Sequence, residues 1–312
     1  MRQFIESLKR LYKDKKVNKD KITLNVGDEF NAKNISNAIL STFTYNLSRN
    51  DKPKKFSFFT CTYKTSELKL KRLYNSIKNQ TYKEWNWFII DDSPNNETID
   101  LIESLKDPRI TIIKNVSRHG SIGFNKNTIA MMCDGDYLVE VDHDDELTTD
   151  CLYHLNEAFK KYPDAGFAYS ICIEYSVDGH KKTPIVYGDG WGWGEGLHKT
   201  ETINNNTEYF SASPSINPYS IRTIYAQPNH VRCWEREIYH KIGGHKPELS
   251  VLDDMDILIR TFLNTKMIKI DKDNILLLNN ATEDDLNDEE YEAVADAFDE
   301  WLDTQEFDEI VG

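Results

Sequence analysis

The sequence lacks any apolar run of the roughly 18 residues that a helix needs to cross a bilayer. It also lacks the apolar core of a secretory signal, because Met1-Arg2-Gln3 lead into a charged amphipathic stretch. Its five cysteines are scattered with no C-x-x-C pair, which indicates neither a disulfide framework nor a zinc site. These absences predict a cytoplasmic protein with reduced thiols and no transmembrane segment.

Positive charge is missing from one end of the chain. Residues 273–312 contain 15 Asp or Glu and no Lys or Arg, so the net charge of −14 belongs to this tail. Residues 1–55 are basic instead, with 13 Lys or Arg against 6 acids. The net acidity therefore does not exclude an anionic partner for the basic segment, although nothing indicates nucleic acid.

The chain of 312 residues, 39% of them hydrophobic, is long enough for one large globular domain with extensions. We expect a basic helical extension at 1–55, a catalytic domain at 56–275 and an acidic amphipathic helix at 276–312. The apolar stripe of the last helix would dock on the body of the protein or on a second subunit, as in a homo-oligomer. Docking on the basic residues 9–21 is the rival interpretation.

From residue 56 onward, short β-prone runs alternate with segments of helical periodicity. This succession predicts an α/β fold with a mostly parallel, Rossmann-like sheet and helices on both faces. Residues 183–229 are rich in Gly, Trp, Asn, Ser and Pro and are expected to form a long functional loop. The expected strands are 56–62, 85–90, 110–113, 137–141 and 165–175, and the expected helices are 68–77, 97–105, 127–133, 152–162, 235–242 and 254–263.

Two acidic clusters follow directly after expected strands, where parallel sheets bind ligands. The first is Asp142-His143-Asp144-Asp145, and it would hold three carboxylates close together. Their mutual repulsion is unfavourable unless a bound cation neutralises it. Oxygen ligands of this kind suit Mg²⁺ or Mn²⁺. A solvated acidic turn is the other interpretation. The second, Asp91-Asp92-Ser93, would accept hydrogen bonds from a nucleoside or form an Asx turn.

Six segments in order resemble motifs of family 2 glycosyltransferases, which have the GT-A fold. The resemblance spans residues 56–265 and leaves both ends of the chain uncovered. It is carried by Ser76–Tyr82 (S-x-x-x-Q-T-Y), the strand ending in Asp91-Asp92-Ser93, Asn127–Leu138, the D-x-D-D of Asp142–Asp145, the Gly243-Gly244 turn, and Asp253-Asp254 with Arg260.

The resemblance implies a role for each matching residue. Thr62, Tyr63 and Asp92 would contact the nucleoside, with Asp91 in support and Lys126 near the nucleotide. Asp142 would reach the ribose or the metal, and Asp144 would ligate the metal with help from Asp145. Asp254 would be the general base that deprotonates the acceptor hydroxyl.

The sequence also departs from the family pattern. The first strand ends in Cys61-Thr62-Tyr63-Lys64 where the family has P-x-Y-N, and His245 stands where Phe is usual. Asp253 replaces the Glu of the E-D pair, and no Q-x-x-R-W motif follows, so a processive synthase is not expected. These differences mark a divergent member whose acceptor cannot be inferred from its relatives.

Some candidate site residues keep two interpretations. Trp191 and Trp193 would stack on a sugar or anchor their loop. His230 and Arg232 would face the acceptor or the diphosphate, or play structural roles, and Asp253 would lie near the acceptor. Arg260 is expected to be an ion-pair partner of the helix.

The resemblance implies an inverting, non-processive transfer of a sugar from a nucleotide sugar to a hydroxyl acceptor. The expected donor is a UDP-sugar with Mn²⁺ or Mg²⁺, and the acceptor is a glycan, a protein or a small molecule. Two alternatives are a nucleotidyltransferase, for which the usual Gly-rich phosphate loop is missing, and a non-catalytic carbohydrate-binding protein with the same fold.

Overall fold

A computed structural model describes residues 53–117, 120–170, 172–174, 198–203, 206–211, 216–218, 220–223, 227–270 and 276–278. Several predictions fall outside these residues. They are the helices of the basic extension, the loop carrying Trp191 and Trp193, and the acidic helix of the tail. Among the described residues, no helix is both long and apolar enough to pass through a membrane.

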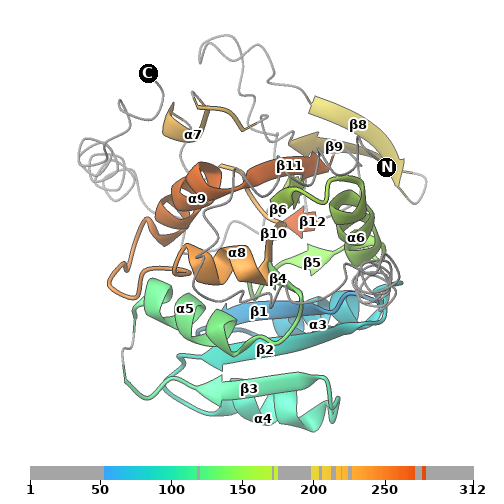
Figure 1. Cartoon of the computed structure of the whole chain (residues 1–312). Coiled ribbons are helices and arrows are strands. Elements are labelled where there is room, and N and C mark those ends of the chain that lie inside the picture. The colour runs from blue at the N-terminus through green and yellow to red at the C-terminus, as the bar shows by residue number, and fades with distance from the viewer. Residues whose placement is uncertain are drawn as a thin grey trace, which may run out of the picture. The chain divides into compact units, whose positions relative to one another are not determined.

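The centre of the fold is a seven-stranded sheet in the order β11-β6-β10-β4-β1-β2-β3 (Figure 1). All neighbouring strands run parallel except β10, which is antiparallel to β4 and β6. The predicted mostly parallel sheet is confirmed. Its strands are β1 (Phe56–Thr62), β2 (Trp85–Asp91), β3 (Ile110–Lys114), β4 (Tyr137–Glu140), β6 (Ala165–Ser170), β10 (Arg232–Glu235) and β11 (Lys266–Ile270).

Side chains on alternate strand positions divide between two hydrophobic cores, one on each face of the sheet. Phe56 and Phe58 of β1 enter the first core with α3, α4 and α6, whereas Phe59 enters the second with α5, α8 and α9. The prediction of helices on both faces is therefore confirmed. The helices are α3 (Glu67–Lys78), α4 (Glu97–Ser104), α5 (Ile122–Met132), α6 (Cys151–Lys161), α7 (Ser220–Thr223), α8 (Arg236–Lys241) and α9 (Asp253–Asn264).

Two predicted elements need correction, and one strand was not predicted. Helix α5 begins at Ile122, five residues before the prediction, because its first turn contains Gly123 and polar residues that weaken the apolar pattern. The expected strand 165–175 is two strands, β6 in the central sheet and β7 in another. Strand β10 was not predicted, because four residues give too short a pattern.

The predicted loop 183–229 also contains regular structure. Strands β8 and β9 pair in an antiparallel hairpin that belongs to a second sheet of order β5-β12-β7-β9-β8. Their sequences, HKTETI and NTEYFS, carry few apolar residues, so no hydrophobic alternation marks them. The strands of this sheet are β5 (Glu146–Leu147), β7 (Cys172–Glu174), β8 (His198–Ile203), β9 (Asn206–Ser211) and β12 (Leu276–Leu278).

Strand β1 lies between β2 and β4, and the chain order reverses there. From β1 the chain crosses to β2 and β3 on one side, then returns to place β4 on the other side of β1. Such a reversal separates the loops that follow the two strands and leaves a crevice at their carboxyl ends. Thr62 and Asp142 both lie at this edge, Thr62 at the end of β1 and Asp142 two residues after the end of β4.

Gly135 lets the turn between α5 and β4 approach β1 closely. A Cβ at this position would lie 2.7 Å from the backbone nitrogen of Ser57 and 2.8 Å from the carbonyl oxygen of Lys55. The close approach of the two backbone segments therefore requires glycine here.

We expect Gly135→Ala to lower the free energy of unfolding by about 1–3 kcal/mol, measured by urea denaturation, because the backbone of β1 cannot shift without a loss of packing and hydrogen bonding. The exposed Glu103→Ala on α4 should change it by less than about 0.5 kcal/mol. Equal stability of both variants would contradict this account.

Candidate functional site

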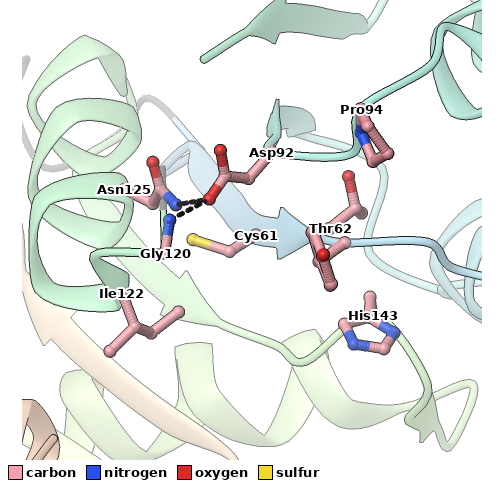
Figure 2. A pocket seen from close by; sticks show the side chains of 9 residues that line it. Cys61, Thr62, Asp92, Pro94, Gly120, Ile122, Asn125 and His143 are labelled. Carbon is pink, nitrogen blue, oxygen red and sulfur yellow. Dashed lines mark hydrogen bonds between the residues drawn. The ribbon is translucent and has the colours of Figure 1, made fainter. Parts of the chain in front are cut away.

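A cleft with a volume of about 600 Å³ opens at the carboxyl ends of β1 and β2 (Figure 2). This volume lies within the range of sites for small ligands and cofactors. The expected nucleoside contacts Thr62, Tyr63 and Asp92 all line it, and Tyr63 is 56% exposed. The other lining residues are Cys61, Pro94, Gly120, Ile122, Asn125 and His143.

Asp92 is fixed by three amide donors. Its carboxylate accepts hydrogen bonds from the Gly120 backbone N–H at 2.7 Å and the Asn125 side chain at 3.3 Å (Figure 2). It also accepts one from the Asn115 side chain at 3.0 Å. Asn115 also donates to the Asn125 side-chain oxygen at 2.8 Å, which orients both amides. The carboxylate is therefore held in one orientation at the wall of the cleft.

Asp91 is buried behind the cleft and connects three strands. Its carboxylate accepts hydrogen bonds from the hydroxyls of Thr62 at 2.9 Å and Ser93 at 2.6 Å, and it forms an ion pair with Lys114 at 2.8 Å. Thr62, Asp91 and Lys114 are also neighbours in the strand register of β1, β2 and β3. This places Asp91 as a support for the cleft wall.

A group of possible metal ligands lies beside the cleft. One ligand atom from each of Glu140, Asp142 and His230 lies within 4.8 Å of the others. The Nδ1 atom of His230 is 3.6 Å from Asp142 and its Nε2 atom is 3.7 Å from Glu140. Burial raises the pKa of Asp142, but His230 and Lys126 offset this and lower it below its usual value, so the carboxylate is ionised.

The other two acids of the cluster point to different surroundings. Asp144 forms an ion pair with Lys69 of α3 at 3.3 Å, and both side chains are largely covered. Asp145 is buried, and its backbone N–H donates to the carbonyl oxygen of Asp142 at 3.3 Å. The structure therefore separates Asp142, which faces His230, from Asp144, which faces α3.

Lys126, expected near the nucleotide, is buried between two carboxylates. Its Nζ atom lies 2.8 Å from Glu140 and 3.0 Å from Asp253. Burial lowers the pKa of Lys126, but Asp253 and Glu140 more than offset this, so its pKa stays well above the usual value and the amine is charged. Burial, assisted by Asp254 and Glu140, raises the pKa of Asp253.

Arg232 and Asp254 form a second ion pair close to the first. The Arg232 guanidinium donates to the Asp254 carboxylate at 3.2 Å and lies 3.7 Å from Glu140. Burial raises the pKa of Glu140, yet Lys126, His230 and Arg232 lower it well below its usual value. Glu140 is thus an ionised carboxylate shared by two buried cations.

His245 lies against the same carboxylate in its neutral form. Burial lowers the pKa of this histidine to about 3, and its Nε2 atom is 3.9 Å from Glu140. Its other ring nitrogen, Nδ1, is 2.7 Å from the hydroxyl of Tyr239 on α8. Lys126 and His245, the latter a departure from the family pattern, therefore lie against the same buried carboxylate.

The prediction that Arg260 is an ion-pair partner is confirmed. Its guanidinium binds Asp256 on the same helix, and it also donates to the carbonyl oxygen of Ile242. These contacts connect α9 to the end of α8. They lie on the helix, away from the cleft-lining residues.

Sequence reasoning missed Glu140, Asn115, Asn125 and His143 as site residues. Glu140 had a usable signal, because a charged residue inside the apolar run Tyr137–Val141 must find a buried partner. Asn115 and Asn125 gave no such signal, since Asn115 follows β3 and Asn125 lies on α5, and no recognisable spacing connects them with Asp92.

The family model for glycosyl transferase family 2 matches residues 57–223 of this chain. The chain therefore belongs to glycosyl transferase family 2. This match covers the cleft, Asp92 and the whole Asp142–Asp145 cluster.

Curated relatives are similar over shorter segments. The glycosyltransferase MJ1057 of Methanocaldococcus jannaschii is 37% identical over 98 residues, which is 30% of this chain and 33% of that protein. The Escherichia coli UDP-Glc:alpha-D-GlcNAc-diphosphoundecaprenol beta-1,3-glucosyltransferase WfaP is 38% identical over 74 residues, 24% of this chain and 29% of that protein. The chain thus matches about a third of each relative.

Solved structures show the same fold. TarS of S. aureus in complex with UDP-GlcNAc has a TM-score of 0.57 at 16% identity, covering 78% of this chain and 65% of that chain. GalNAc-T7 with UDP, GalNAc and Mn²⁺ has a TM-score of 0.51 at 13% identity, covering 70% of this chain and 43% of that chain. The predicted GT-A fold is confirmed.

The burial of Lys126 gives a stability prediction. Lys126→Met would leave the carboxylates of Glu140 and Asp253 without their shared cation, so we expect the free energy of unfolding to fall by about 3–5 kcal/mol in urea denaturation. Lys160→Met removes an exposed lysine that pairs with Glu157, and it should change stability by less than about 1 kcal/mol. A stable Lys126→Met protein that loses only nucleotide affinity would show that Lys126 binds the ligand instead.

Proposed function

We propose that this protein transfers a sugar from a UDP-sugar to a hydroxyl acceptor, with inversion at the anomeric carbon and without processive polymerisation. One observation carries the proposal. The cleft holding Asp92 lies beside Asp142 and His230 at the reversal of the strand order, so a nucleoside in the cleft would extend its diphosphate toward them. Family membership supports transfer of a sugar over transfer of a nucleotide.

Asp92 would read the nucleobase. A carboxylate accepts hydrogen bonds only, so it favours the imide N–H of uracil over the bare ring nitrogen that cytosine presents at the same position. Tyr63 exposes its ring at the mouth of the cleft and would stack on the base. TarS, which shares the fold, was solved with UDP and with UDP-GlcNAc, and this supports a uridine donor.

A divalent cation fits the residues beside the cleft. The Nε2 atom of His230 is buried and has no hydrogen-bond partner among the described residues, and the Asp142 side chain facing this imidazole is 45% exposed. Carboxylate ligands suit Mn²⁺, and a neutral imidazole is a common metal ligand in proteins. We propose Asp142 and His230 as protein ligands, with Asp144 and Asp145 as the further ligands that the D-x-D-D resemblance implies. The bound cation would neutralise charge on the departing diphosphate.

Asp254 would act as the general base. It removes the proton from the acceptor hydroxyl, the hydroxyl oxygen attacks the anomeric carbon, and the bond from that carbon to the diphosphate oxygen breaks. The products are the glycosylated acceptor and UDP. Asp253 is buried against Lys126, so little of its side chain can reach an acceptor.

The extent of the catalytic domain, the roles of the two chain ends and the acceptor are also part of the proposal. Residues 56–275 would form the catalytic domain of a cytoplasmic protein, and the two ends of the chain would mediate contacts with the acceptor, with an anionic surface or with a second copy. The acceptor is an unidentified hydroxyl compound, and Trp191 and Trp193 would contribute to its binding.

A panel of nucleotide sugars tests the donor. Thermal unfolding with and without Mn²⁺ should show a higher midpoint temperature for one UDP-sugar, because a bound ligand stabilises the folded state by mass action. The panel should include UDP-GlcNAc, with the matching CDP- and GDP-sugars as controls. Slow release of UDP from the same sugar should follow. Binding without any turnover would favour a non-catalytic carbohydrate-binding protein.

The metal site is tested by substituting its two acids separately. Asp142→Asn should raise the Mn²⁺ concentration needed for half-maximal UDP release by about tenfold or more, a loss of about 1.4 kcal/mol. Asp144→Ala should abolish release if Asp144 is also a ligand, and should have a small effect if its role is the ion pair with Lys69. Activity that is unchanged by chelation would overturn the metal proposal.

The base is tested with Asp254→Asn. We expect this variant to bind UDP and Mn²⁺ with normal affinity while the turnover number falls by about 10²- to 10⁴-fold, because the amide cannot accept the proton. Calorimetry measures the binding and UDP release measures the turnover. Normal turnover would exclude Asp254 as the base.

A further inference from the structure

Arg232 is a fully buried cation whose role the motif pattern left open between the diphosphate and the structure. It lies on β10 directly opposite Glu140 of β4 in the strand register, and its side chain is 2% exposed. It does not contribute to the lining of the described cleft. A guanidinium in this position cannot reach a diphosphate without leaving its buried contacts.

The guanidinium makes contacts in three directions. Its Nε atom donates to the carbonyl oxygen of Pro228 at 2.8 Å, and its Nη1 atom lies 3.7 Å from Glu140. Its Nη2 atom donates to the Asp254 carboxylate at 3.2 Å. The planar guanidinium of arginine can contact three separate groups at once through its different nitrogen atoms, whereas the ammonium group of lysine is a single point charge.

Asp254 is held from two sides. Its Oδ2 atom accepts from Arg232, and its Oδ1 atom accepts from the backbone N–H of Met255 at 2.8 Å. The side chain keeps 19% of its surface exposed, so part of the carboxylate still faces outward. A base must present its lone pair to the proton that it removes, and a misplacement of about 1 Å can cost about 10²-fold in rate.

We infer that Arg232, anchored by Glu140 and the Pro228 carbonyl, is a positioning residue that orients Asp254 for proton removal and does not bind the donor. This inference rests on the proposed function of Asp254. It connects β4, which leads into Asp142, with the helix that carries the base. Glu140 is then the fixed anion that determines where the guanidinium lies.

The test separates turnover from donor affinity. Arg232→Ala should lower the turnover number for UDP release by about 10- to 100-fold, since an unrestrained base is misplaced. Its affinity for UDP with Mn²⁺, measured by calorimetry, should stay within threefold of the unmodified protein. Added guanidinium ion should restore part of the turnover, because it can occupy the space that the side chain leaves. A parallel loss of UDP affinity, or no loss of turnover, would overturn the inference.

Two further variants keep the test valid if Arg232→Ala does not fold. Arg232→Lys keeps a buried charge without the fork, and Glu140→Gln keeps the shape of the anchor without its charge. Both should reduce turnover, and Arg232→Lys should also leave the affinity for UDP unchanged. As a control on the same helix, Arg260→Lys should lower stability but leave turnover unchanged.

The two levels of failure are distinguishable. If the unmodified protein releases UDP from no sugar in the panel, the proposed function fails. If the unmodified protein releases UDP and Arg232→Ala lowers UDP affinity and turnover to the same extent, only the positioning role fails. Arg232 would then be interpreted as a ligand of the donor diphosphate.

Discussion

The buried carboxylate of Glu140 is the constraint on which the site depends. It is ionised in the interior of the protein, where an unpaired charge is very costly, so Lys126 and Arg232 must be held close to it. Those two cations in turn bind Asp253 and Asp254 at the start of α9. The position of the helix relative to β4 is therefore set by charge pairing as well as by apolar packing.

This arrangement divides the polar residues between two tasks. The cleft side holds Asp92, which lines the cleft, with Asp142 and His230 next to it, whereas the interior side holds cations that are already paired with carboxylates. The sequence predicted two cations near the donor, Lys126 and Arg232. Both lie on the interior side instead. A donor diphosphate would then rely on a bound cation for charge neutralisation, and this fits a metal-dependent transfer.

The fold is shared with solved structures at low sequence identity. TarS and GalNAc-T7 are 16% and 13% identical to this chain, with TM-scores of 0.57 and 0.51. His245, which stands where the family usually has Phe, lies 3.9 Å from the Glu140 carboxylate, and Lys126 pairs with the same group. A buried charge of this kind persists only where neighbouring groups pair with it.

The sequence by itself determined the alternation of strands and helices, the acidic clusters at the strand ends and the family. These features depend on local periodicity and on residue order, which are visible along the chain. It could not determine which acids face a ligand, because that depends on strand pairing: Arg232 meets Glu140 across β10 and β4, 92 positions apart. The amide donors around Asp92 were hidden for the same reason, whereas the hairpin β8–β9 was missed because its strands lack apolar alternation. Only the tertiary structure brings such distant polar residues together and decides which charges are buried in pairs and which stay open to bind.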